Sequence, residues 1–437
     1  MAQAADVAHL LRRAGFGGTT AQVATLASQA WATTVDGLLD FSGAPADVQP
    51  SYLTDATSVT ADWQKEYKLQ QWWLDRMATT TTPLQEKLTL FWHGHFATAN
   101  YKVSDMLLMY QQNALFRANA LGNFRDLVQQ MSLQPAMLVW LDNDFNVAGS
   151  PNENFARELM ELFTLGVNQY TQPDVVASAR AWTGHNTLDG NNEVYQFYPN
   201  RHDSGMKTFM GVTKNWDGPD IIQYILGDDP THKQIAASFI ATKMWTFFAY
   251  PNPEPSVVSD LTTAFLANDL SIHDLVRAIF MHPQFLSTEA KQGLVRSPAE
   301  WVAACLRVAN ITAEDANPQW YMDDMGQQLF EPPNVSGWRP NEYWVTTSRL
   351  WARANWARGL VWQNNVQNTL NAIQPMTVSD AVQYGFDFFG IDNPSAHTRA
   401  TLETWLTNQR ADKNAWINWT WINLLTQLML CPEFNLA

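Results

Sequence analysis

Residues 62–79 and 83–92, DWQKEYKLQQWWLDRMAT and PLQEKLTLFW, carry the pattern on which the expected fold rests. In both stretches apolar residues recur every three or four positions, which is the spacing of one buried face on an α-helix. Pro83 follows a Thr-rich turn, where a proline suits the first turn of a new helix. The two stretches therefore predict consecutive amphipathic helices.

The same spacing recurs along most of the chain and predicts a mostly α fold. Mixed aromatic and polar residues at 193–198 predict one arm of a small β-hairpin, within an insertion around 184–218. We expect a single large multi-helical domain over residues 1–437, with a C-terminal helical lobe from about residue 290 as the alternative division. The other expected helices are 5–14, 20–39, 105–121, 124–131, 154–165, 173–183, 218–226, 232–248, 256–268, 272–281, 298–308, 346–364 and 415–430.

The composition of the 437 residues indicates an ordered, aromatic-rich protein. Hydrophobic residues make up 46% of the chain and charged residues 16%, against roughly 25% charged residues in a typical soluble domain. Such a chain buries a sizeable core, which excludes global disorder. Its 20 tryptophans serve equally well as core filler or as flat platforms for sugars.

The charge balance limits the classes of partner that we expect this protein to bind. With 27 Lys and Arg against 42 Asp and Glu, the formal net charge is −15, which repels phosphate backbones and excludes nucleic acid as an expected partner. No apolar run approaches the ~18 residues of a membrane span, so no membrane insertion is expected. The N-terminus lacks a signal-peptide pattern, so we expect a cytoplasmic protein, or a secreted or periplasmic one whose signal was removed. Cys305 and Cys431 are expected to be buried free thiols, and the oligomeric state is left open.

The run FWHGHF at 91–96 is the first candidate site. Gly94 favours the end of the helix there, and in an extended segment His93 and His95 fall on one face. Two imidazoles on one face suit a transition metal such as zinc, copper or iron. The alternative is that each histidine makes a local hydrogen bond within an aromatic core.

A polar stripe marks the second candidate, NENFARELMELF at 152–163. Asn154, Glu158 and Glu161 follow one another at i, i+4 and i+7, and Arg157 stands beside them. Arg157 can hold one carboxylate ionised while a desolvated neighbour stays protonated, which is the asymmetry that acid/base catalysis uses. The alternative is a solvated face with ion pairs such as Glu153–Arg157.

Oxygen-bearing side chains just before this stripe have the spacing of a calcium loop. Asp142, Asp144, Asn146 and Glu153 occupy positions 1, 3, 5 and 12 of a twelve-residue window. Position 6, where a calcium loop needs glycine, is Val147. An ordinary turn rich in Asp and Asn is therefore the competing interpretation.

Two polar segments complete the candidates. His202 and Asp203 supply either a metal ligand or a general base with its orienting partner, and a surface turn is the alternative. The segment PPNVSGW at 332–338 and the aromatic and arginine residues after it predict a wall of a ligand cleft, with cation–π packing as the alternative. The expected substrate-binding side chains are Trp92, Trp182, Lys207, Trp338, Trp344 and Arg349.

Taken together, the segments HLLRRAGFG (9–17), FWHGHF (91–96), NENFARELMELFTLG (152–166), HDSG (202–205) with Lys207, and PPNVSGW (332–338) resemble the bacterial domain-of-unknown-function 1800 family over nearly the whole chain. The resemblance implies one full-length domain, a bacterial origin and a frequent association with exported proteins. It implies no activity, because the family's chemistry is not established. It does imply that the His, Glu and His-Asp segments belong to one pattern and meet in space.

The leading functional hypothesis is a hydrolase that acts on a polysaccharide or glycoside. Two carboxyl groups in unlike environments provide acid and base, and indoles stack on sugar rings. Its proposed catalytic residues are Glu158 as the acid, Glu161 or Asp203 as its partner, and Arg157 and His202 beside them. One alternative is a metalloenzyme in which His93 and His95 share a metal with Glu158, Glu161 or His202. The other is a glycan-binding or scaffold protein that does not cut its ligand.

Overall fold

The fold is mostly helical, with two small antiparallel sheets inserted between helices α11 (Gln172–Ala181) and α12 (Gly218–Gln223). The computed structural model describes residues 2–55, 61–188, 191–412 and 417–437. Strand β1 (His185–Leu188) pairs with β2 (Asn191–Phe197), and β3 (Lys207–Phe209) pairs with β4 (Val212–Lys214). The mostly α class and the hairpin insertion expected from the sequence are thereby confirmed.

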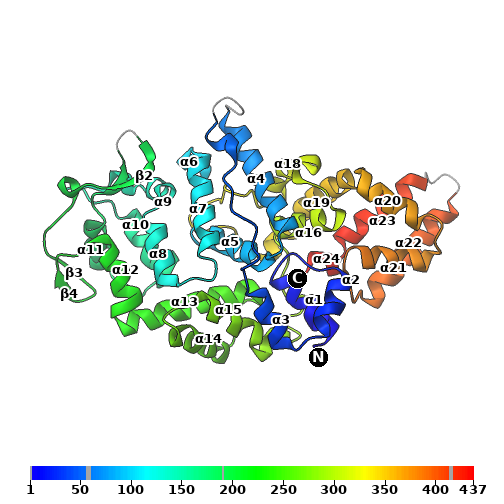
Figure 1. The fold of residues 1–437 in the computed structure, drawn as a ribbon, viewed down its shortest axis with the longest axis horizontal. Helices are drawn as coiled ribbons and strands as arrows, with labels where there is room; N and C mark the ends of the chain where they lie inside the picture. The colour runs from blue at the N-terminus through cyan, green and yellow to red at the C-terminus, as the bar shows by residue number, and fades with distance from the viewer. Residues whose placement is uncertain (1, 56–60, 189–190, 413–416) are drawn as a thin grey trace.

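Figure 1 shows the sheets at one end of an elongated molecule and the helices α20 to α23 at the other. Helices α5 and α16 lie between these ends. The remaining helices are α1 (Ala4–Arg13), α2 (Thr20–Ala27), α3 (Trp31–Leu38), α4 (Asp62–Thr79), α5 (Pro83–His95), α6 (Asn100–Val103), α7 (Met106–Ala118), α8 (Phe124–Ser132), α9 (Pro135–Trp140), α10 (Asn154–Glu158), α13 (Pro230–Phe248), α14 (Pro255–Ala267), α15 (Ile272–Met281), α16 (Pro298–Ala309), α17 (Ala313–Ala316), α18 (Gln319–Met325), α19 (Thr347–Leu360), α20 (Asn364–Ile373), α21 (Val378–Phe388), α22 (Ala396–Ala411), α23 (Ile417–Leu430) and α24 (Pro432–Asn435).

Three of the expected helices differ in form from the prediction, and one of them, expected over 218–226, changes at Tyr224 into a π-helical turn (Tyr224–Asp228). The single helix expected over 20–39 is wrong, because the chain breaks after α2 and restarts as α3 at Trp31. The Trp31 indole donates a hydrogen bond to the carbonyl of Phe280, 3.1 Å away, so a distant segment fixes this second start. The helix expected over 154–165 changes at Leu159 into a π-helical turn (Leu159–Thr164). The pattern also missed the short helices α6, α17 and α24 and the longer ones α9, α18, α20, α21 and α22. Residues 415 and 416 of the last expected helix lie outside the described residues.

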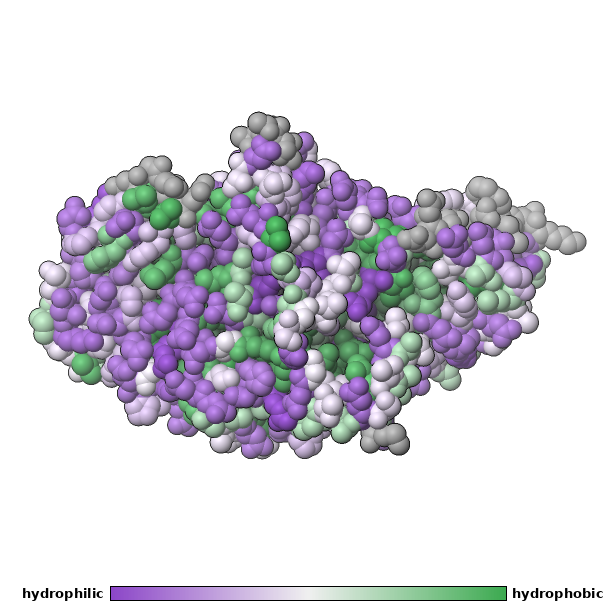
Figure 2. All heavy atoms as spheres, in the orientation of Figure 1, coloured by the Kyte–Doolittle hydropathy of each residue, from purple (hydrophilic) through white to green (hydrophobic). Residues whose placement is uncertain are grey.

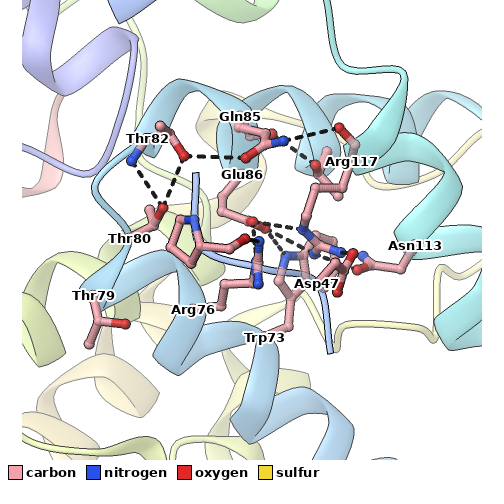
Figure 3. A network of polar contacts seen from close by, with 12 residues as sticks. Asp47, Trp73, Arg76, Thr79, Thr80, Thr82, Gln85, Glu86, Asn113 and Arg117 are labelled. Atoms are coloured by element: carbon pink, nitrogen blue, oxygen red, sulfur yellow. Dashed lines mark hydrogen bonds and ion pairs between the residues drawn. The ribbon is translucent and has the colours of Figure 1, made fainter. Parts of the chain in front are cut away.

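A buried ion cluster fixes α4 against α5 and α7, as Figure 3 shows. The fully buried carboxylate of Glu86 accepts hydrogen bonds from Arg76 Nε at 2.5 Å, Arg117 Nε at 2.7 Å and the Trp73 indole at 2.9 Å. Removing one partner of a buried ion pair typically costs about 3–5 kcal/mol, because a charge is left uncompensated. The C-terminal half of α4 is therefore held firmly in place.

The core is aromatic, and the surface drawn in Figure 2 is mostly polar with smaller apolar areas between. One hydrophobic cluster of the described residues extends from Leu10 to Phe434 in sequence and includes many of the tryptophans. Cys305 and Cys431 are buried free thiols, as expected. Within the described ranges, none of the helices combines the length and the apolar run that crossing a bilayer requires.

Candidate functional site

Exposed aromatic rings gather where the first half of α4 meets α18. Both helices lie on the upper edge of the view in Figure 1. Trp63 is 55% exposed and Trp320 is 57% exposed. The Tyr67 ring lies between them, with ring centroids 5.7 Å from Trp63 and 4.6 Å from Trp320. Indoles are usually more buried than this, and joined exposed rings mark a surface suited to binding.

Glu66 lies on the same face of α4, three residues after Trp63 and one before Tyr67. Its Oε1 accepts hydrogen bonds from the side-chain amides of Gln328 at 2.8 Å and Gln70 at 3.1 Å, and its Oε2 accepts one from Asn100 at 3.3 Å. Burial raises the pKa of Glu66, and these three amides act against that rise. Neutral donors rather than cations therefore orient this carboxyl group.

The second carboxyl group of the site is Glu331, which follows α18 in a loop. Its half-buried position, followed by the charge of Glu66, raises its pKa to about 7, while the backbone N–H of Tyr101 acts in the opposite direction. The Tyr101 ring is 64% exposed beside it. Because burial, and then the charge of Glu66, raise the pKa of Glu331 to about 7, a large fraction of the molecules keep this carboxyl group protonated at neutral pH.

The loop that carries Glu331 is held in a strained conformation. Phe330 has a φ of +66°, a left-handed conformation that a bulky residue rarely adopts. Its backbone N–H donates to His93 Nε2 at 3.1 Å and its carbonyl accepts from the backbone of Asn100 at 2.9 Å. Such strain costs about 1–3 kcal/mol and is concentrated at functional sites.

His93 and His95 do not share a ligand site, and the extended segment expected for FWHGHF is wrong. Helix α5 continues through His95, so the two imidazoles point away from each other. His95 Nε2 donates to the carbonyl of Phe163 at 3.0 Å, whereas His93 accepts from Phe330. Burial lowers the pKa of His93 to about 3, so this ring is neutral and acts as an acceptor that positions the Glu331 loop. Local hydrogen bonds in an aromatic core were the alternative interpretation.

The polar stripe at 154–161 is interrupted by the π-helical turn, which begins directly after Glu158. Burial, followed by the charge of Glu161, raises the pKa of Glu158, and Arg157 opposes the rise. Glu161 accepts a hydrogen bond from the Tyr170 hydroxyl. Arg157 pairs with Glu153 at 3.0 Å, as the solvated-face interpretation expected. This segment therefore holds a second pair of interacting carboxyl groups.

The side chains with calcium-loop spacing have other partners. Asp142 pairs with Lys102 at 2.7 Å, and Asn146 Oδ1 accepts the backbone N–H of Asn152 at 2.9 Å. Asp144 is half-buried, and burial together with Asp142 raises its pKa to about 6. Among the residues that the structure describes, no group of three or more His, Cys, Asp or Glu side chains lies close enough to hold a metal ion.

The His-Asp segment forms a separate polar cluster beside the sheets. Asp203 pairs with Arg180 at 2.7 Å, and this hydrogen bond is the main reason that the pKa of Asp203 falls to about 2. His202 Nδ1 lies 2.8 Å from the carbonyl of Thr183. Lys207 donates to the carbonyls of Gly205 at 3.1 Å and Trp216 at 2.9 Å. These contacts hold the turn between β2 and β3.

Two of the expected substrate-binding side chains lie at one pocket. Trp338 and Trp344 border a mostly apolar pocket of about 310 Å³, together with His95 and Lys243. Burial lowers the pKa of Lys243 to about 8. Of the other four, Trp92 and Trp182 are fully buried and Lys207 is 1% exposed, so these three are unsuited to contact a ligand. The fourth, Arg349, stacks its guanidinium on Tyr343. The pocket does bring FWHGHF and PPNVSGW together, since Gly337 packs directly against the carbonyl of Gly94.

Sequence reasoning missed Glu66 and Glu331. The only local signal was the spacing of Trp63, Glu66, Tyr67 and Gln70, which places two aromatic and two polar residues on one helical face. Gln328, which bonds to Glu66, lies 262 residues further along the chain, so no local pattern joins the two halves of the site.

Comparison with known proteins gives one match. No curated protein and no solved structure matches the chain. A protein family described as "Protein of unknown function (DUF1800)" matches residues 9–436, which is nearly the full length. The chain therefore belongs to the DUF1800 family.

Proposed function

We propose that this protein is a hydrolase that acts on a polysaccharide or glycoside, with Glu331 as the general acid and Glu66 as the partner carboxylate. The observation that carries the proposal is the pKa of Glu331, raised to about 7 by burial and by Glu66. A carboxylic acid that is still partly protonated at neutral pH, beside an oriented second carboxyl group, is the asymmetry that glycoside cleavage uses.

The surrounding rings support a sugar as the substrate. Trp63, Trp320 and Tyr101 are each more than half exposed and lie on the elements that hold the two carboxyl groups. Flat, partly apolar rings stack on the faces of sugars, while amides such as Gln328 and Asn100 offer hydrogen bonds. The same surface suits an extended glycan better than a small apolar molecule.

This assignment moves the acid from Glu158 to Glu331. Asp203 has a pKa of about 2 because of Arg180 and is a poor partner for proton transfer. Glu158 has a raised pKa, but the charge of Arg157 opposes the rise and Tyr170 already donates to its neighbour Glu161. In the part of the chain that the structure describes, no cation opposes the rise at Glu331.

The test measures the release of reducing ends from a panel of soluble polysaccharides by the native protein and by Glu331→Gln, with Glu158→Gln as the matched control. We expect Glu331→Gln to lose about 100-fold or more of the rate, the usual contribution of general acid catalysis. Glu158→Gln should keep most of it, and both variants should unfold cooperatively.

Two outcomes would overturn the proposal. One is unaltered turnover in Glu331→Gln. The other is that the native protein binds glycans without cutting them and that Glu331→Gln binds them with the same affinity. That result would identify a glycan-binding protein without catalytic activity.

A further inference from the structure

A second pocket, of about 230 Å³, has arginine side chains on its walls. Arg12 reaches it from α1, Arg296 from the segment before α16, and Arg307 from α16 itself. Among the described residues that line it, Asp392 is the only carboxylate. The pocket shares no lining residue with the Glu66 and Glu331 site.

The arginines keep donors that the protein does not use. Arg12 Nε and one terminal nitrogen of Arg296 are buried without a hydrogen-bond partner, and Arg296 is only 5% exposed. Arg307 donates to the carbonyl of Ala78 at 3.2 Å. Buried donors without partners are rare and costly, so each one calls for an acceptor.

The charges in and around the pocket are also unbalanced. Three guanidinium groups face one carboxylate, which leaves a formal excess of two positive charges on the pocket walls. Burial, followed by the charge of Arg12, lowers the pKa of Arg296 to about 10. Glu300, a buried carboxylate whose charge acts on Arg296, is paired with Lys87. In a chain of net charge −15, this is a local concentration of positive charge.

The remaining walls carry four phenylalanine rings beside smaller side chains and Thr19. Phe16, Phe388, Phe389 and Phe434 line the pocket, and the Arg296 guanidinium lies 4.8 Å from the centroid of the Phe434 ring. Besides the arginines, the pocket therefore offers aromatic contact to whatever is attached to an anionic group.

We propose that this arginine pocket binds a small molecule that carries a phosphate monoester. A phosphate monoester carries a charge of about −1.5 to −2 at neutral pH and several acceptor oxygens, which matches both the excess charge and the unused donors. Guanidinium forks bind such oxyanions in bidentate geometry. The phenylalanine rings take the organic part of the ligand, whose size is limited by the volume of the pocket.

The experiment is isothermal titration calorimetry of the full chain with inorganic phosphate, phenyl phosphate and malonate at constant ionic strength. We expect phenyl phosphate to bind more tightly than phosphate, and malonate to bind least. Arg12→Gln should weaken phenyl phosphate binding about tenfold or more, since a hydrogen bond to a charged group contributes about 1.5–3 kcal/mol.

Two further variants make the result specific. Asp392→Asn removes the only carboxylate on the walls and should tighten binding several-fold, the opposite direction to Arg12→Gln. Arg277→Gln removes a surface arginine that pairs with Asp36 and should change nothing. Phenyl phosphate that does not bind at millimolar concentration, tighter binding of malonate, or equal binding by Arg12→Gln and Asp392→Asn would each overturn the proposal.

Discussion

Two pairs of interacting carboxyl groups differ in how the protein holds them. Glu158 and Glu161 belong to one continuous helical segment, with Arg157 and the Tyr170 hydroxyl beside them. Glu66 and Glu331 come from distant parts of the chain and are held by neutral amides and a strained loop. The pKa of Glu331 reaches about 7, and Arg157 opposes the rise at Glu158.

The difference shows what a nearby cation does to a carboxyl pair. A positive charge favours the ionised form and restores ordinary acidity, whereas burial beside a like charge favours the protonated form. A carboxyl pair without a nearby cation destabilises the folded state, and one of its members can donate a proton at neutral pH.

The largest effect concerns the pH dependence of turnover. If Glu331 supplies the proton, the rate should fall about tenfold per pH unit above about pH 7, where this group loses its proton. An acid with the ordinary value of 4.5 would already be ionised at pH 6. Rates measured from pH 4 to pH 9 check this, and a rate that stays constant from pH 7 to pH 9 contradicts it.

The second prediction concerns the support beneath Glu331. His93→Ala removes the acceptor of the Phe330 N–H and opens a cavity against the Trp73 ring, so we expect a loss of about 3 kcal/mol of unfolding free energy. His273→Ala, at a half-exposed position, should cost less than about 0.5 kcal/mol. Urea unfolding of both variants measures this, and equal midpoints would refute the role given to His93.

The third prediction concerns a substitution that raises the free energy of unfolding, whereas most substitutions lower it. Because the folded pKa of Glu331 lies above its ordinary value of 4.5, the folded state holds a proton that the unfolded chain releases. The stability that this proton contributes is complete below about pH 4.5 and is lost as the pH rises through about 7. Glu331→Gln mimics the protonated form, so it should be more stable than the native protein at pH 8 by about 1–2 kcal/mol.

The free energy of unfolding is measured for the native protein and for Glu331→Gln at pH 4.5 and at pH 8, and the two proteins are compared at each pH. Glu158→Gln serves as the comparison and should gain less at pH 8, because Arg157 compensates the charge of Glu158. If Glu331→Gln gains no more unfolding free energy at pH 8 than Glu158→Gln does, the two carboxyl pairs do not differ in this way.

The smallest effect concerns the aromatic surface. Trp320→Ala should weaken glycan affinity about three- to tenfold, since an aromatic contact contributes about 0.5–1.5 kcal/mol beyond its buried area. Trp362 is 51% exposed and packs against Trp419, so Trp362→Ala is the matched control and should not change affinity. Equal losses of glycan affinity in the two variants would show that the rings around Glu66 contribute no more to binding than other exposed rings.

The sequence predicted the long amphipathic helices well. Helix α4 has the expected limits of 62–79, because its apolar spacing is regular and Pro83 opens the next helix. Regular spacing failed at residues 28–30, where the contact of Trp31 with Phe280 decides the break. The helix end expected from Gly94 is also wrong, since α5 continues through the buried His95.

The candidate site was beyond the reach of local patterns for a physical reason. The pKa of a carboxyl group depends on burial and on charges that approach only in the folded chain, and Glu331 owes its rise to both. Spacing identified Glu158 and Glu161 because they are neighbours on one helical segment. It identified His93 too, although as a metal ligand rather than as the acceptor beneath Phe330.

Helix α4 is anchored at one end and carries the candidate site at the other. Trp73 and Arg76 bind the buried Glu86, whereas Asp62 and Trp63 are exposed at the first turn. Local opening takes place where buried contacts are fewest, so backbone amides of the first turns should exchange with deuterium sooner than those near Trp73. A ligand seated on Trp63 and Glu66 would slow exchange in those turns alone, and this local change would locate the binding site before any substrate is known.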